Sequence, residues 1–187
     1  ELQKVSGVSW STVADESEQV LASIGNNSTR LQGLLNLNLG QAHLDAGGIP
    51  SANQSLAEAR RLARRDDDWN TMVRATNIQA NILRQQGFLN EAISTLRQVI
   101  HSLLNPVEGV KKNSNPIIGA LYADLGRNLM AQNHLTEAEQ LLEDGIALLE
   151  TIHEPLFLCD SYISLARLRS IAGDFDEAFV LLDKVAD

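Results

Sequence analysis

The chain has 187 residues, 44% of them hydrophobic, which is enough for one domain with a sizeable core. Its formal net charge of −9 disfavours contact with phosphate backbones, so we expect no direct nucleic-acid binding. No apolar run reaches the roughly 18 residues that span a bilayer, and no signal peptide is recognisable, so we expect a cytoplasmic protein without a membrane segment. The single cysteine, Cys159, excludes an internal disulfide and fits a reducing compartment.

The first expected element is a helix near residues 13–24. We interpret residues 1–29 as the remnant of a preceding repeat helix followed by a linker, because the repeats that follow are made of similar helices. The chain does not begin with Met, so we expect it to be a piece of a longer protein.

A repeat begins near residue 30 and is marked by four alanines, Ala52, Ala92, Ala138 and Ala178. Five residues before each alanine stands a residue that tolerates left-handed backbone: Gly47, Gly87, Asn133 and Gly173. Twelve before it stands a small residue: Gly40, Ala80, Gly126 and Ala166. Four after it stands a leucine: Leu56, Leu96, Leu142 and Leu182. Small residues let two antiparallel helices approach closely, and we expect the leucines to fill the space beside the crossing.

Each repeat is therefore predicted to be a helix, a short turn and a second helix. In chain order the expected helices cover 30–46, 50–65, 70–86, 89–104, 116–132, 135–152, 156–172 and 175–186. They form four hairpins at about 30–66, 69–105, 115–153 and 155–187. The second connection is longer than the others, because prolines at 106 and 116 disfavour helix just before them. The acidic run at 66–68 is expected to cap the following helix.

These hairpins resemble the tetratricopeptide repeat, most closely in Leu125-Gly126 with Thr136-Glu137-Ala138-Glu139, and in Gly87 with Asn90-Glu91-Ala92. Their greater length resembles the repeat domain of the MalT-type large transcriptional activators of the LuxR family, as in residues 87–97 and in 115–126 followed by 134–146. The resemblance implies an all-α, right-handed superhelix of antiparallel hairpins, an α-solenoid. In that family the repeat domain receives the inducer and lies between an ATPase region and a DNA-binding domain. This chain contains neither a P-loop motif nor a helix-turn-helix ending.

The candidate binding site is the face of the first helices, which lines the concave side of such superhelices. Eleven residues before each marker alanine stands a polar residue, giving the stripe Gln41, Asn81, Arg127 and Arg167. Helical spacing adds Arg74, Asn77 and Arg84 on the second repeat, and Asp160 precedes Arg167 on the fourth. Such a groove suits a polar ligand, an acidic peptide or a neighbouring domain. The alternative is an ordinary solvated helix face, and Tyr122 and Tyr162 beside it are expected to pack rather than stack on a ligand.

Catalytic chemistry is not predicted. The four histidines, His43, His101, His134 and His153, lie in different repeats without metal-ligand spacing. We interpret Cys159 as a buried packing residue rather than a nucleophile. The chain is thus expected to need no metal and no cofactor and to be no enzyme, although the parent protein could carry an ATPase domain.

Three functions stay open at this point. The first is a regulatory domain of a MalT-like regulator that binds a small-molecule inducer or a protein. The second is a general protein–protein interaction scaffold that holds a peptide in its groove. The third is an enzyme whose catalytic groups come from another part of the chain. The repeats are also expected to contact neighbouring domains of the same chain, and self-association of the repeats is a further expectation. Replacing Arg74 and Arg127 by glutamate is predicted to abolish binding without changing stability.

Overall fold

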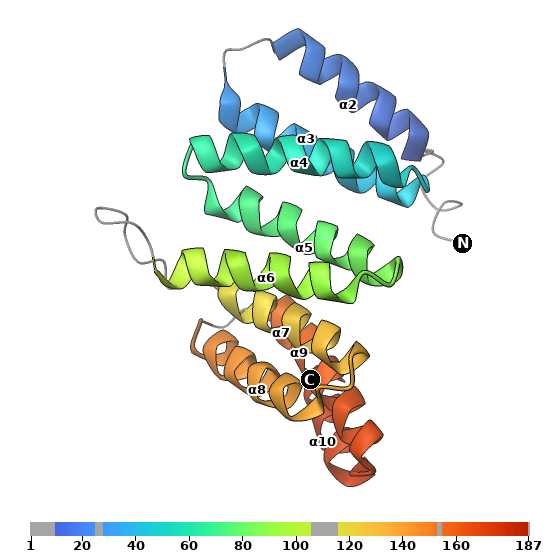
Figure 1. Ribbon diagram of the computed structural model, residues 1–187, viewed down its shortest axis with the longest axis vertical. Coiled ribbons are helices and arrows are strands. Elements are labelled where there is room, and N and C mark those ends of the chain that lie inside the picture. The colour runs from blue at the N-terminus through green and yellow to red at the C-terminus, as the bar shows by residue number, and fades with distance from the viewer. Residues whose placement is uncertain (1–9, 25–27, 106–115, 153–154, 187) are drawn as a thin grey trace. The chain divides into compact units, whose positions relative to one another are not determined.

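The computed structural model describes residues 10–24, 28–105, 116–152 and 155–186 (Figure 1). Within these ranges every regular element is an α-helix. The chain divides into two compact units, Glu1–Ile82 and Leu83–Asp187, called here the N-terminal and C-terminal units and described separately. None of the described helices combines the length and the apolar character that crossing a bilayer requires.

The N-terminal unit contains α2 (Trp10–Ile24), α3 (Thr29–Asp45), α4 (Ile49–Arg65) and most of α5 (Trp69–Gln85). Helix α3 packs against α2 and α4 (Figure 1). The turn between α3 and α4 passes through Gly47, whose φ of 82° is left-handed and favours glycine. The core of this unit is built from buried apolar side chains on α3, α4 and α5: Leu37, Ala52, Leu56, Ala59, Ala75 and Ile82.

Close approach of α3 and α4 depends on the small residue that the repeat places opposite a leucine. A Cβ added at Gly40 would lie 2.7 Å from Cγ of Leu56, which is fully buried. In the C-terminal unit, a Cβ added at Gly126 would lie 2.9 Å from Cγ of Leu142. In both hairpins the leucine fills the space beside the small residue, as expected from the sequence.

The C-terminal unit contains α6 (Leu89–Leu104), α7 (Pro116–Ala131), α8 (Leu135–Ile152), α9 (Pro155–Ala172) and α10 (Phe175–Ala186). Helices α7 and α8 form one antiparallel pair and α9 and α10 form another, while α9 also packs against α7 and α8 (Figure 1). The α7–α8 pair also approaches closely at Gly119 and Gly145. A Cβ on either glycine would lie 3.0 Å from the carbonyl oxygen of the other.

The observed helices of the repeats begin and end within one residue of the expected positions. The left-handed turn positions are confirmed, with φ of 82° to 87° at the three turn glycines and 63° at Asn133. Asp68 caps α5 as expected, since its carboxylate accepts hydrogen bonds from the backbone N–H (3.2 Å) and the hydroxyl (2.7 Å) of Thr71. The grouping into four hairpins after a remnant at 1–29 stays a prediction, and the connection at 106–115 lies outside the described residues.

Two expectations about burial are wrong. Leu182 was expected to fill the hairpin crossing, but 43% of it is exposed and the adjacent Leu181 is buried instead. The reason is that α10 packs against α9 on one side only, so the face that carries Leu182, Phe179 and Val180 meets no described helix. Cys159 was expected to be buried, but it is a half-buried free thiol near the beginning of α9.

Candidate ligand-binding site

A pocket of about 410 Å³ lies in the C-terminal unit and brings together four of the eight candidate residues: Arg84, Arg127, Asp160 and Arg167. All of its lining residues belong to α5, α7 and α9, which the sequence predicts to be the first helices of the second, third and fourth repeats. Met130, Ala131, Ile163, Ser164 and Ile171 complete the lining. The volume falls in the range of small-molecule sites, which is about 300–1,000 Å³.

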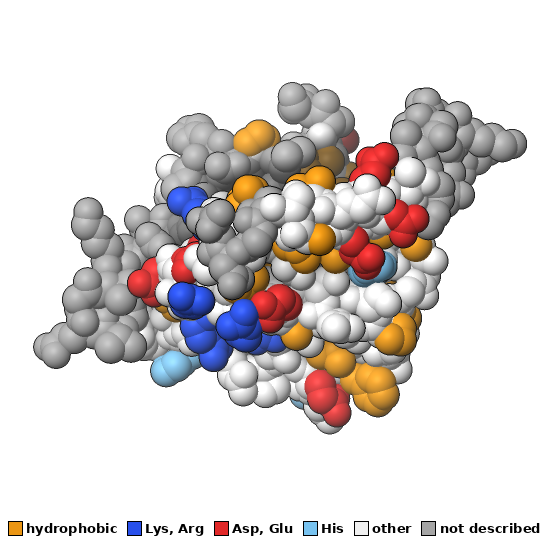
Figure 2. All heavy atoms as spheres, turned by 90° about the horizontal axis from the view of Figure 1, so that it is seen from above, with side chains coloured by type: hydrophobic (Ala, Val, Ile, Leu, Met, Phe, Trp, Pro, Cys, Tyr) orange, Lys and Arg blue, Asp and Glu red, His pale blue; other side chains and the backbone are white. Residues whose placement is uncertain are grey.

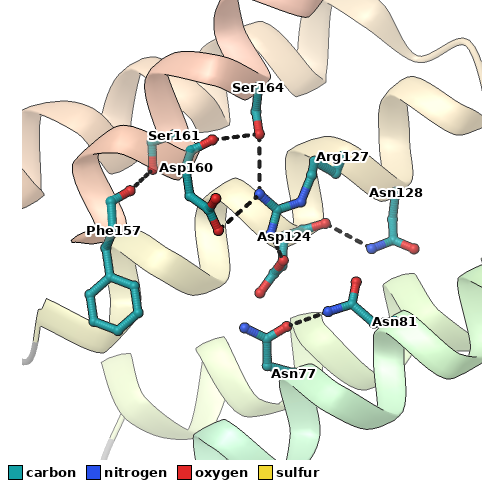
Figure 3. Close-up of polar contacts among 9 residues, drawn as sticks. All are labelled: Asn77, Asn81, Asp124, Arg127, Asn128, Phe157, Asp160, Ser161 and Ser164. Atoms are coloured by element: carbon teal, nitrogen blue, oxygen red, sulfur yellow. Dashed lines mark hydrogen bonds and ion pairs between the residues drawn. The ribbon is translucent and has the colours of Figure 1, made fainter. Parts of the chain in front are cut away.

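Arg127 lies at the centre of a polar network in this pocket (Figure 3). One end of its guanidinium donates to the carboxylate of Asp124, one turn earlier on α7. The other nitrogen donates to the Ser164 hydroxyl at 3.1 Å and lies 3.8 Å from the Asp160 carboxylate, both on α9. Arg127 therefore joins α7 to α9, and its side chain is only 25% exposed.

Asp124 is the buried acid of this network, and only 1% of it is exposed. Burial raises its pKa from 3.8 to about 6, and nearby Asp160 adds to the rise, while Arg127 and Arg84 oppose it. Its second oxygen, Oδ2, accepts no hydrogen bond from the described residues. Sequence reasoning missed this residue, although an acid one turn before the stripe arginine was visible in the third repeat.

This network corrects one expectation. Replacing Arg127 was predicted to leave stability unchanged, but Arg127 is the partner of a buried carboxylate. Removing one member of a buried pair leaves the other uncompensated and typically costs about 3–5 kcal/mol. Arg127 is thus both a structural residue and a pocket residue, and Arg167 is the better probe of binding.

Arg167 differs from Arg127 although both occupy the same position of the repeat. It is exposed at the pocket, and it makes no hydrogen bond or ion pair with the described residues. The residue one turn before it is Ser164, where the third repeat has Asp124. The fourth repeat thus keeps the arginine and lacks the acid that neutralises it.

The remaining candidates lie in the N-terminal unit, where three of them make contacts within their own helix. The Gln41 amide donates to Asp45 at 2.9 Å on its own helix, α3. On α5, Asn81 donates to Asn77 at 3.1 Å, while Arg74 is exposed. These contacts are those of an ordinary polar helix face, and nothing in them tests a binding role.

A second pocket of about 570 Å³ lies between α2, α3 and α4 and was not predicted. Its lining is polar and includes Glu18, whose carboxylate lies 3.6 Å from the His43 ring, together with Asn36 and Ser55. This pocket has mixed charge and no uncompensated cluster among the described residues, because Arg61 in its lining pairs with Glu58 at 2.6 Å.

A run of basic residues ends α4, and sequence reasoning gave it no role: Arg60, Arg61, Arg64 and Arg65. Figure 2 shows Lys and Arg side chains gathered on the face that it views. Basic residues stabilise the carboxyl end of a helix through its dipole, and Arg61 is already paired with Glu58. The run is explained by helix stability without a ligand.

The two tyrosines pack, as expected. Tyr162 is buried, donates to the Glu150 carboxylate at 2.5 Å, and has the Lys184 ammonium 5.1 Å from its ring centre. Burial and the bond to Glu150 raise the pKa of Tyr162 to about 12. Tyr122 is half-buried and lies against Gly145.

Within the described ranges, no group of three or more His, Cys, Asp or Glu side chains is arranged to hold a metal ion. His101 and His134 are exposed, His43 is half-buried, and His153 lies outside the described residues. The lining of the arginine pocket offers cationic hydrogen-bond donors and apolar contact.

Comparison with known protein families identifies the family to which the chain belongs. Residues 8–187 match the family described as the MalT-like TPR region. The chain belongs to this family. Both the resemblance read from the sequence and the all-α, tetratricopeptide-like solenoid are thereby confirmed. Comparison with curated proteins gave no match.

Solved structures share the fold of this MalT-like region at low sequence identity. BtubC (BKLC) from P. vanneervenii superimposes with a TM-score of 0.74 at 16% identity, over 98% of this chain and 74% of that one. The nearly identical TPR-like repeats of a putative kinesin light chain from Podosopora anserina give 0.63 at 22%, over 95% and 85%. MamA gives 0.58 at 21%, over 98% and 90%.

Proposed function

We propose that this chain is the sensing region of a MalT-like transcriptional regulator, and that its first helices bind an inducer or a regulatory partner. The observation that carries the proposal is the pocket of the C-terminal unit. Its walls come entirely from first helices, and it gathers Arg84, Arg127 and Arg167 in a chain of net negative charge. Family membership supports the same role. A bound ligand would shift the regulator between states only through different affinities for them.

The test is a thermal-shift screen of a metabolite library against three proteins. These are the unchanged chain, Arg167→Gln in the pocket, and Arg64→Gln as the matched control, an exposed arginine on α4 outside the pocket. The proposal predicts at least one compound whose stabilisation is lost in Arg167→Gln and kept in Arg64→Gln. Stabilisation that is equal in all three proteins for every hit would contradict it. The parent gene supplies a second test, since a MalT-like regulator should encode a P-loop upstream and a helix-turn-helix downstream.

The second candidate is a general protein-interaction scaffold, and the exposed apolar face of α10 favours it. Phe175, Phe179 and Val180 are 60%, 67% and 57% exposed, more than a solvated face needs. This alternative predicts capture of protein partners that Phe179→Ser abolishes, with no response to metabolites.

A further inference from the structure

We propose that the pocket of the C-terminal unit, lined by Arg84 at the end of α5 and by side chains of α7 and α9, binds a small amphipathic anion, namely an organic carboxylate or phosphate monoester that carries an apolar tail. The inference rests on the proposed sensing function and deepens it, because it names the chemical class of the ligand. An anionic ligand also distinguishes this pocket from a groove that binds neutral polar molecules.

The charged side chains that line the pocket are mostly positive. Arg84, Arg127 and Arg167 place three positive charges around the pocket, against Asp160 in the lining and Asp124 buried behind Arg127. The chain as a whole carries −9, so this local excess of positive charge runs against the average of the protein. An anion gains most from such a site, since charge-assisted hydrogen bonds from a planar guanidinium are stronger than neutral ones.

Comparison of the third and fourth repeats shows which arginine is available to bind a ligand. In the third repeat Arg127 is held by Asp124, and its other nitrogen already donates to Ser164. In the fourth repeat a serine stands where Asp124 would be, so Arg167 reaches the pocket without an acid one turn earlier on its own helix. The Ser164 hydroxyl instead helps to orient Arg127. Arg167 is therefore the principal anion ligand, and Arg127 is a pre-oriented second one.

The lining also contains large apolar side chains beside Arg167. Ile163 and Ile171 stand four residues on either side of Arg167 on α9, so all three side chains lie along one face of the helix. The isoleucines are 47% and 56% exposed, and Met130 lies across the pocket on α7. A solvated face accounts for an arginine but not for two large exposed isoleucines flanking it. A ligand with a charged head at Arg167 and an apolar tail would cover them and gain about 25 cal/mol for each Å² removed from water.

The negative charge of Asp160 limits where the anionic head of the ligand can bind in the pocket. Its carboxylate is 69% exposed and lies 3.8 Å from Arg127, on the side of α9 nearer its beginning. An anionic head is repelled by Asp160 and attracted by Arg167, so it should sit towards Arg167 and Ile171. Removing the negative charge with Asp160→Asn should therefore strengthen anion binding.

The experiment measures calorimetric binding of four probes to the whole chain. Hexanoate and phenyl phosphate are amphipathic anions with different heads, hexanamide is the uncharged counterpart, and inorganic phosphate has the charge without the tail. We expect saturable binding of at least one amphipathic anion and about tenfold weaker binding of hexanamide and of inorganic phosphate. The tighter of hexanoate and phenyl phosphate identifies the carboxylate or phosphate source.

Three variants assign the binding to this pocket. Arg167→Gln should weaken the anion about tenfold, Asp160→Asn should strengthen it, and Arg64→Gln should leave it unchanged within about twofold. Hexanamide that binds as tightly as hexanoate and depends on Arg167 would overturn the anion assignment while leaving the sensing function intact. No saturable binding of any probe, or equal loss in Arg167→Gln and Arg64→Gln, would overturn the ligand class as well as the site.

Discussion

Replacing Gly145 by alanine tests the packing of the α7–α8 pair, on which the C-terminal unit depends. The added Cβ would lie 3.0 Å from the carbonyl oxygen of Gly119 and 3.1 Å from Cβ of Tyr122. Neither atom belongs to the flexible end of a side chain, so the two helices must move apart by a few tenths of an ångström.

Two effects of opposite sign determine how much Gly145→Ala changes the free energy of unfolding. Overpacking in a tight core typically costs about 1–3 kcal/mol. Alanine in place of glycine inside a helix stabilises the folded chain by about 0.5–1 kcal/mol, because alanine loses less backbone entropy on folding. The net expectation for Gly145→Ala is a loss of about 0.5–2 kcal/mol in the free energy of unfolding.

Gly33 provides the matched control, because it is also a buried glycine inside a helix, α3. The atom nearest to its added Cβ is Cβ of Leu62 at 3.6 Å, an ordinary van der Waals contact. Gly33→Ala should therefore stabilise the chain by about 0.5–1 kcal/mol, since only the helix-propensity gain remains. Urea unfolding followed by circular dichroism measures both variants. Stabilisation of equal size in both would refute the close contact at Gly145.

Two further predictions concern charged groups. Asp124→Asn should remove a pH dependence of the free energy of unfolding. The pKa of Asp124 is raised to about 6 in the folded chain, so its protonated form stabilises the fold, fully below about pH 4. This contribution is lost as the pH rises through 6. The free energy of unfolding of the unchanged chain minus that of the variant should thus fall by about 3 kcal/mol between about pH 4 and 7, and a constant difference in urea melts would contradict this. Arg169→Gln should cost about 1–3 kcal/mol, because its largely buried guanidinium pairs with three glutamates on α8 and α10. Arg97→Gln, which breaks one exposed pair with Glu137, should cost less than about 1 kcal/mol, and equal thermal shifts would contradict the difference.

The repeat architecture could be read from the sequence because its determinants are local. Left-handed turns favour glycine or asparagine, and close crossings favour small residues with a leucine beside them, so spacing alone located Gly87, Asn133 and the close approach at Gly126 beside Leu142. Leu182 was mispredicted because α10 packs against α9 on one side only and the adjacent Leu181 takes the buried position, which the repeat spacing does not encode.

The site was predicted only in part for a similar reason. The repeat register identified Arg127 and Arg167 as equivalent positions, but it did not show that one is neutralised and the other is not. That difference depends on Asp124 being buried one turn before Arg127, which is a property of the packing between helices. The apolar contribution of Ile163 and Ile171 was missed because apolar residues at helical spacing are typical of a face that packs in the core.

The central claim is that the arginine pocket on the first helices is the surface that binds. Its most direct test is a titration of the chain with hexanoate, followed through the arginine side-chain N–H resonances. The account predicts a saturable shift for Arg167 and a smaller one for Arg127, while Arg64 and Arg65 at the end of α4 stay unchanged. Shifts confined to the α4 arginines, or shifts that never saturate at any arginine, would contradict the claim.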